Sequence, residues 1–192
     1  MMKKRFAQWL LTRLGWRLEG ARPALERYVL IAAPHTSNWD FPYMLIFAAA
    51  FDIKVTWMAK HSLFFPPVGW IMRAMGGMPI VRHERGNVVD GMVEAFKTAA
   101  QLVLVVPTEG TRERTDHWKS GFYHIARQAG VPIVPSFLDF GRKRGGFGAA
   151  METTDDVRAD MQYFRDFYAG MLGKFPHQFG PIQLREEDTL DS

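Results

Sequence analysis

The apolar stretch Tyr28-Val29-Leu30-Ile31-Ala32-Ala33 ends at Pro34, and His35-Thr36-Ser37-Asn38-Trp39-Asp40 follows it directly. A short apolar run that stops at a proline predicts a buried strand, and the polar residues after it predict a loop at the end of that strand. Functional groups concentrate in such loops. Because a histidine oriented by a carboxylate can take a proton from an alcohol, His35 and Asp40 are candidates for a general base and its partner.

Strands and helices alternate on both sides of this stretch. We expect strands at 28–33, 54–58, 78–81, 101–106 and 132–140, and helices at 1–20, from 40 onward, near 68–75, and at 87–99, 123–129 and 155–172. Such alternation is typical of the α/β class, here a single layered domain with a largely parallel central sheet flanked by helices. The sequence contains no internal repeat or linker, so we predict one domain over residues 1–192.

A second motif follows another apolar strand. Leu102-Val103-Leu104-Val105-Val106 leads, after Pro107 and Thr108, into Glu109-Gly110-Thr111-Arg112. Ligands of parallel α/β sheets bind outside the carboxyl ends of the strands, so both motifs could open onto one face. The planar guanidinium of Arg112 suits a phosphate group, and Gly110 permits a close approach of the backbone.

The order and spacing of four blocks resemble the glycerolipid acyltransferase family, typified by 1-acyl-sn-glycerol-3-phosphate acyltransferases. The first and third blocks are the two motifs above. The second runs from Trp57-Met58-Ala59-Lys60 to Gly76-Gly77-Met78-Pro79-Ile80-Val81-Arg82, and the fourth is Gly130-Val131-Pro132-Ile133-Val134-Pro135. The resemblance therefore extends from about Val29 to Asp139.

The resemblance implies an enzyme that moves a fatty acyl group from an acyl thioester to the free hydroxyl of a lysophospholipid. The acceptor is by default 1-acyl-sn-glycerol-3-phosphate, and the donor is acyl-CoA or acyl carrier protein. His35 would be the general base and Asp40 its partner, with no metal or other cofactor. The substrate-binding residues that it implies are Gly110, Thr111 and Arg112 for the acceptor phosphate, Glu109 to orient Arg112 or backbone amides, and Lys60 and Arg82 to line the anionic pocket.

Several positions depart from the family pattern. The family often has asparagine where Pro34 stands, phenylalanine and proline in place of Pro107 and Thr108, and serine in place of Glu113. The residues with proposed chemical roles are unchanged, so the reaction type is kept while the acceptor headgroup stays open. Phe64, Phe65, Trp70 and Met75 are candidates to line a groove for the acyl tail.

The composition limits the alternatives. With 47% apolar and 23% charged residues the chain has the character of a folded domain, and its lack of cysteine excludes disulfides, thiolate zinc sites and cysteine nucleophiles. No apolar run reaches the roughly 18 to 20 residues that span a bilayer. The net charge of +4 is not organised into a recognised nucleic-acid-binding module, so no nucleic-acid partner is expected.

The N-terminal residues 1–20 combine basic and apolar side chains. Phe6, Leu10 and Leu14 lie four apart, with Trp9 beside them, which places them on one stripe of a helix. Basic residues next to tryptophan and leucine suit an interfacial helix on an anionic membrane surface. The alternative is an amphipathic helix that packs on the domain. Together with the resemblance, this pattern predicts a cytoplasmic protein peripherally associated with the membrane.

Two other functions remain open. The same His35 base could activate water, which would make the protein an ester or thioester hydrolase, although the G-x-S-x-G motif of α/β-hydrolases is absent. The protein could also be a peripheral lipid-binding protein that has this fold and catalyses no reaction. A requirement for an acceptor lipid would separate the transferase from the hydrolase.

Overall fold

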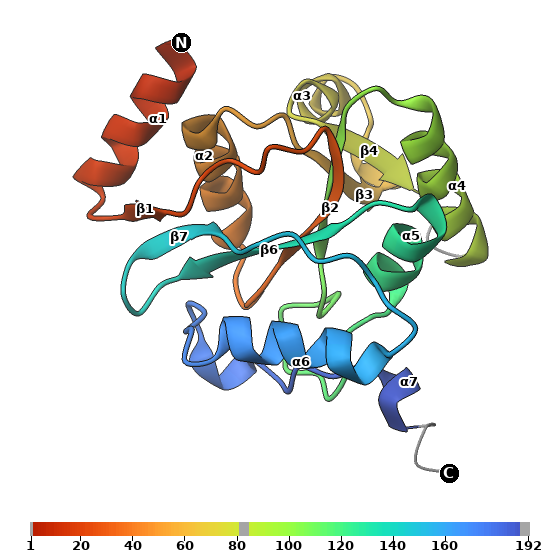
Figure 1. The fold of residues 1–192 in the computed structure, drawn as a ribbon. Coiled ribbons are helices and arrows are strands. Elements are labelled where there is room, and N and C mark those ends of the chain that lie inside the picture. The colour runs from red at the N-terminus through yellow and green to blue at the C-terminus, as the bar shows by residue number, and fades with distance from the viewer. Residues whose placement is uncertain (1, 81–84, 189–192) are drawn as a thin grey trace.

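The computed structural model describes residues 2–80 and 85–188 and is built around a seven-stranded sheet with strand order β1-β7-β6-β2-β5-β3-β4 (Figure 1). The strands are β1 (Arg17–Glu19), β2 (Arg27–Ala32), β3 (Thr56–Lys60), β4 (Gly77–Ile80), β5 (Leu102–Pro107), β6 (Ile133–Asp139) and β7 (Arg144–Phe147). The helices are α1 (Met2–Arg13), α2 (Asp40–Phe51), α3 (Val68–Ala74), α4 (Arg85–Thr98), α5 (Gly121–Ala129), α6 (Val157–Tyr168) and α7 (Arg185–Asp188), with short 3-10 turns η1 (His61–Leu63) and η2 (Pro176–Gln178).

The sheet is largely parallel, as the alternation of strands and helices predicts. β2 lies at its centre and pairs in parallel with β5 on one side and β6 on the other, and β3 and β4 continue the parallel order. β7 runs antiparallel to β6, and β1 runs parallel to β7. This two-stranded extension was not expected from the sequence.

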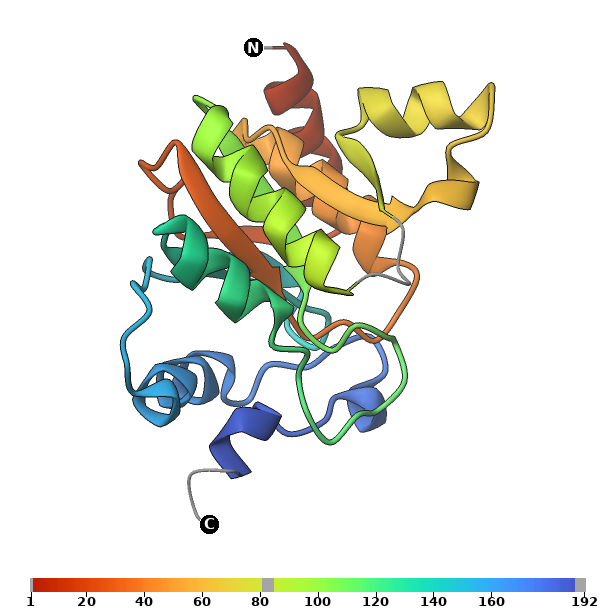
Figure 2. The ribbon, with the colours of Figure 1, turned by 90° about the vertical axis from the view of Figure 1, so that its right-hand side faces the viewer.

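Both faces of β2 are buried, which explains its continuous apolar run. Val29 and Ile31 face a core formed with α4, α5 and α6, whereas Leu30 faces a second core formed with α1 and α2. The fold therefore has three layers, with the sheet between two layers of helices (Figures 1 and 2). A strand buried on both sides has no polar positions, in contrast to the alternating pattern of a half-buried strand.

The N-terminal helix is shorter than the expected range of 1–20. α1 ends at Arg13, the chain turns at Gly15 with φ of +78°, and residues 17–19 form β1 instead. Glycine adopts this left-handed conformation without steric cost, which is why it ends the helix here. The helix packs on the domain through Ala7 and Leu11, while Phe6 and Trp9 of the expected stripe stay exposed.

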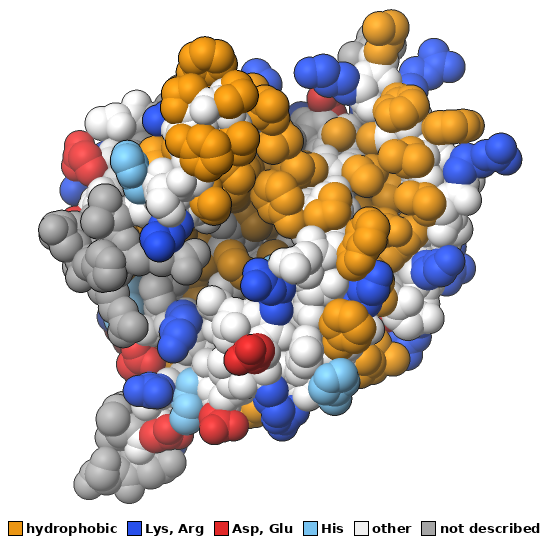
Figure 3. All heavy atoms as spheres, turned by 180° about the vertical axis from the view of Figure 1, so that it is seen from behind, with side chains coloured by type: hydrophobic (Ala, Val, Ile, Leu, Met, Phe, Trp, Pro, Cys, Tyr) orange, Lys and Arg blue, Asp and Glu red, His pale blue; other side chains and the backbone are white. Residues whose placement is uncertain are grey.

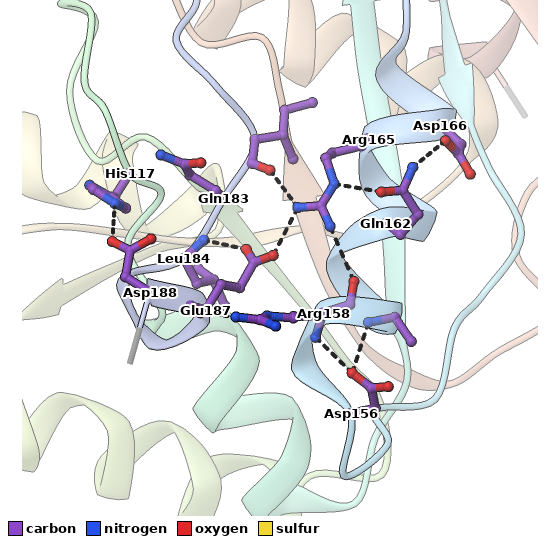
Figure 4. Close-up of polar contacts among 12 residues, drawn as sticks. His117, Asp156, Arg158, Gln162, Arg165, Asp166, Gln183, Leu184, Glu187 and Asp188 are labelled. Carbon is purple, nitrogen blue, oxygen red and sulfur yellow. Dashed lines mark hydrogen bonds and ion pairs between the residues drawn. The ribbon is translucent and has the colours of Figure 1, made fainter. Parts of the chain in front are cut away.

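The C-terminal segment is fastened to α6 by a polar network around Arg165 (Figure 4). Its guanidinium donates to Gln162 Oε1 at 2.9 Å and to Glu187 Oε2 at 2.9 Å. It also donates to the carbonyl oxygens of Ile182 at 3.1 Å and Arg158 at 3.2 Å. These contacts hold the chain after α6 in a defined path across one end of the sheet.

Within residues 2–80 and 85–188, no helix has the length and apolar character needed to cross a bilayer.

Candidate active site

The two sequence motifs emerge side by side from the centre of the sheet. β2 and β5 are parallel neighbours, and their last residues, Ala32 and Pro107, are register partners. The loop that begins at Ala33 and the turn that begins at Thr108 therefore leave the same edge of the sheet, as expected for the carboxyl ends of parallel strands. Sheet register thus brings together segments that lie more than 70 positions apart in sequence.

His35 and Asp40 form a hydrogen-bonded pair. The His35 Nδ1 atom lies 3.1 Å from Asp40 Oδ2, and the same oxygen accepts hydrogen bonds from the backbone N–H groups of Thr36 and Ser37, each at 2.9 Å. Asp40 is buried at the first turn of α2, where the helix dipole favours a negative charge. A proton on Nδ1, directed at Asp40, leaves the Nε2 lone pair free to accept a proton.

Glu109 links the second motif to the first. Its two carboxylate oxygens accept from the backbone N–H of His35 at 3.1 and 3.0 Å. The residue is 1% exposed, and this burial raises the pKa of Glu109 from 4.5 to about 7 although the His35 hydrogen bonds oppose the change. The sequence left two roles for Glu109, to orient Arg112 or to orient backbone amides. The structure shows the second, and the amide is that of His35.

A cavity of about 600 Å³ opens beside the two motifs. Its polar end carries His35, Asp40, Gly110, Thr111 and Arg112. The apolar wall is formed by α2, α3 and the sheet, and includes Leu30, Met44, Phe47, Ile53, Val55, Trp57, Met58, Met72, Phe137 and Leu138. The cavity has the size of a ligand site, and it joins a site for charged groups to a space for an apolar chain.

The Gly110 turn places Arg112 at the polar end. Gly110 has φ of +69°, a conformation that side-chain-bearing residues rarely adopt. A Cβ atom at this position would also lie 3.0 Å from Lys119 Cγ. Arg112 is exposed at the side of the cavity, where its guanidinium can reach a bound anion.

One candidate binding residue is not among those that line the cavity, and another lies outside the described residues. Lys60 ends β3 and is exposed, outside the cavity lining found in the described ranges, so its role stays a prediction. Arg82 lies outside the described residues. Phe64, Phe65, Trp70 and Met75, expected along an acyl groove, do not line the cavity either, and Met72 of the same segment does.

The structure adds a third segment to the site that the sequence did not reveal. The backbone N–H of Phe175 donates to Thr36 Oγ1 at 3.2 Å. One end of the Gln178 side-chain amide lies 2.7 Å from the Thr36 carbonyl oxygen and 2.8 Å from the Arg112 carbonyl oxygen. Because both partners are acceptors, we assign the amide nitrogen to this end, where it donates to both. Residues 173–178 therefore connect the histidine loop to the arginine turn. No local pattern marks these residues, because their partners lie in loops far away in the sequence.

Side chains that commonly bind metals do not cluster in the part of the chain that the structure describes. Among residues 2–80 and 85–188, no group of three or more histidine, cysteine, aspartate or glutamate side chains is arranged to hold a metal ion. The expected absence of a metal stays a prediction.

The fold and these two motifs define a class of protein. The family model described as Acyltransferase matches residues 16–139, and the chain belongs to this family. The resemblance inferred from the four blocks is thereby confirmed.

Particular members of the family are named for one reaction. The chain is 29% identical over 153 residues to the 1-acyl-sn-glycerol-3-phosphate acyltransferase of Saccharomyces cerevisiae, covering 69% of this chain and 49% of the yeast protein. It is 30% identical over 131 residues to the enzyme of the same name from Salmonella typhimurium, covering 63% of this chain and 52% of that protein. The chain thus spans about half the length of these curated relatives.

A solved structure shares the fold. The 1-acyl-sn-glycerophosphate acyltransferase PlsC of Thermotoga maritima superposes with a TM-score of 0.58 at 19% identity, covering 86% of this chain and 75% of that protein. This likeness confirms the expected α/β architecture.

Proposed function

We propose that the protein transfers a fatty acyl group from an acyl thioester to the free hydroxyl of 1-acyl-sn-glycerol-3-phosphate, with His35 as general base. The observation that carries this proposal is the 3.1 Å pair of His35 Nδ1 and Asp40 Oδ2 at the polar end of a cavity with an apolar wall. The names of the relatives support the choice of acceptor.

The reaction needs only a proton carrier from the protein. His35 Nε2 takes the proton of the acceptor hydroxyl as the hydroxyl oxygen attacks the thioester carbonyl carbon. The tetrahedral intermediate then expels the thiolate, which receives the proton back from the imidazolium. Asp40 holds the ring in the required tautomer and stabilises its positive charge. The acceptor is itself the nucleophile, so no acyl-enzyme forms.

The polar end and the apolar wall of the cavity bind different parts of the substrates. Arg112, with Gly110 and Thr111, binds the acceptor phosphate, for which a guanidinium offers paired donors. The apolar wall receives an acyl chain. Glu109 keeps the His35 backbone in place through its two hydrogen bonds and does not contact the anion. The donor thiol is that of coenzyme A or acyl carrier protein, since either presents the same thioester.

The substrates also suggest where the protein works. Its acceptor is a lipid, and α1 exposes Phe6 and Trp9 among the basic residues Lys3, Lys4 and Arg5. We therefore propose peripheral association with an anionic membrane surface on the cytoplasmic side, through α1.

The test measures thiol release and lipid product together. Palmitoyl-CoA and palmitoyl acyl carrier protein are offered with and without 1-acyl-sn-glycerol-3-phosphate, and the lipid is analysed by mass. Because the chain has no cysteine, a thiol-reactive dye detects no thiol of the enzyme. The wild type should yield phosphatidate only with acceptor, and His35→Ala should lose the activity.

The matched control is His124→Ala, which removes an exposed histidine of α5. This variant should retain wild-type turnover. Thiol release without acceptor would support the hydrolase instead. A folded protein that is silent with both donors and a panel of lysolipids would support the lipid-binding protein.

A further inference from the structure

Exposed hydrophobic side chains gather on two elements. Of the twelve large hydrophobic residues exposed in the described ranges, nine lie in residues 2–14 or 63–71. The second group, which we call the α3 patch, consists of Leu63, Phe65, Val68, Trp70 and Ile71, and their exposed fractions run from 39% to 68%. Concentrations of exposed apolar residues of this kind mark interaction sites.

The α3 patch lies on the tightly packed connection, η1 and α3, between the parallel strands β3 and β4. Gly69 packs against the Phe64 carbonyl so closely that a Cβ atom would lie 2.3 Å from its oxygen. The Arg73 guanidinium lies 5.2 Å from the centre of the Phe64 ring, and Trp57 Nε1 donates to the Met75 carbonyl at 2.9 Å. The buried side of this connection is thus anchored to the domain, and its hydrophobic outer side has a fixed orientation.

The α3 patch and α1 flank the cavity. Met72 of α3 and Met44 of α2 both line the cavity, and α1 packs on α2. Figure 3 shows two groups of hydrophobic side chains with a hollow between them, one over α3 and one over α1 and α2. A flat surface that touched both groups would cover the hollow.

The charged side chains within both segments have one sign. Residues 2–18 and 60–76 contain no aspartate or glutamate. The exposed basic residues of these two ranges include Lys3, Lys4, Arg5, Arg13, Lys60 and Arg73. Segments that combine hydrophobic side chains with cations complement the surface of an anionic bilayer, whose headgroups attract lysine and arginine while its acyl region accepts aromatic and aliphatic side chains.

We propose that the α3 patch is a second membrane-insertion element, which acts together with α1 to hold the opening of the cavity against an anionic lipid bilayer. It extends the proposed function, because two attachment points on either side of the cavity let a lipid acceptor pass from the bilayer without crossing water. A single helix at α1 would leave the orientation of the cavity free.

The first experiment detects insertion directly. Since the natural chain has no cysteine, Ile71→Cys can carry a single environment-sensitive fluorophore. Vesicles of phosphatidylcholine and phosphatidylglycerol should shift its emission to the blue. A label at Leu172→Cys, an exposed apolar position beyond α6, should not shift. An unshifted Ile71→Cys label on vesicle-bound protein would overturn the proposal.

The second experiment measures affinity without turnover, so that it stands even if acyl transfer is not found. Trp70→Glu should lower partition onto the same vesicles about tenfold, because it replaces an inserted aromatic side chain by an anion. Leu172→Glu should leave partition unchanged. Equal binding of Trp70→Glu and wild type would overturn the proposal, as would a wild-type dimer that Trp70→Glu dissociates, because the patch would then be an interface between two copies.

If acyl transfer is found, kinetics can separate a role of Trp70 in membrane docking from a role in the reaction. Trp70→Glu should keep wild-type turnover of short-chain, water-soluble substrates and lose it in proportion to binding when the acceptor is embedded in vesicles. If Trp70→Glu also loses turnover of the water-soluble substrates, Trp70 acts in the reaction site, and its role in docking is overturned.

Discussion

At the scale of single residues, the site depends on carboxylates whose partners are backbone amides. Asp40 Oδ2 accepts from two amides and from the His35 ring, and Glu109 accepts from the His35 amide. The histidine is therefore held at its ring and at its backbone by different carboxylates. Such preorganisation means that no residue has to move when the imidazole becomes charged.

Removing the charge of Asp40 should slow the reaction strongly. Asp40→Asn can still accept from the Thr36 and Ser37 amides, but it no longer stabilises the imidazolium. We expect kcat to fall by about 10²- to 10⁴-fold with little change in KM. Steady-state kinetics measures this, and Asp90→Asn, an exposed position of α4, is the control. If kcat of Asp40→Asn stays within about threefold of the wild-type value, Asp40 has no role in the mechanism.

Glu109 should make the protein less stable as pH rises. The folded-state pKa of about 7 lies above the ordinary 4.5, so between these values the folded state keeps a proton that the unfolded state has released. The free energy of unfolding therefore falls between about pH 4.5 and 7, in total by about 3 kcal/mol from this group.

Glu109→Gln removes this titration while keeping the shape of the side chain. Urea unfolding of both proteins at pH 5 and pH 8 should show a smaller loss of stability with pH in the variant. Parallel pH profiles of the wild type and the variant would contradict the assignment.

At the scale of elements, the site is closed by a segment outside the region that the family model matches. Residues 173–178 touch the histidine loop through Thr36 and the arginine turn through Arg112. The path of this segment depends on the Arg165 network between α6 and the C-terminal residues (Figure 4). A segment that contributes no residue to the cavity lining found in the described ranges can therefore set the distance between the two motifs.

Loss of the Gln178 amide should loosen the site more than the fold. Gln178→Ala removes two hydrogen bonds, each contributing about 1 kcal/mol to the arrangement of the loops. We expect kcat/KM for the acceptor to fall about tenfold, since small displacements of a binding group cost this much or more. His177→Ala, the exposed neighbour, serves as the control. Equal losses in both variants would assign the effect to the backbone of the segment.

At the scale of the whole molecule, segments far apart in the chain share one of the two cores. α6, contributed late in the sequence, packs Met161, Phe164 and Tyr168 against the same cluster as Val29 and Ile31 of β2. A core built from early and late parts of the chain is expected of one cooperative unit, and the single domain over residues 1–192 stays a prediction.

A core substitution in α6 tests this unity. Phe164→Ala, at a fully buried position, should lower the free energy of unfolding by about 3 to 5 kcal/mol. Calorimetry should show one transition displaced to lower temperature in the variant. Two separated transitions, with only one displaced, would mean that the chain contains two independent units.

Most strands and helices could be predicted because their signals are local. Because β2 is buried on both faces, its sequence is an uninterrupted apolar run. The buried apolar residues of α6 recur at helical spacing. β7 is different: its sequence, Arg144-Gly145-Gly146-Phe147, has weak strand character, and Gly146 is needed because a Cβ atom would lie 1.8 Å from the Glu19 carbonyl oxygen. That requirement exists only once β1 lies beside it.

The sequence by itself determined the class of fold, the family and the two motifs, since apolar periodicity and the order of chemical groups are properties of neighbouring residues. Only the tertiary structure decided that Glu109 holds the His35 amide, that Gln178 reaches both loops, and that the stripe of α1 faces outward together with the α3 patch. These features arise from contacts between segments far apart in the chain, whose positions are set by sheet register and by the packing of helices on the sheet and on one another.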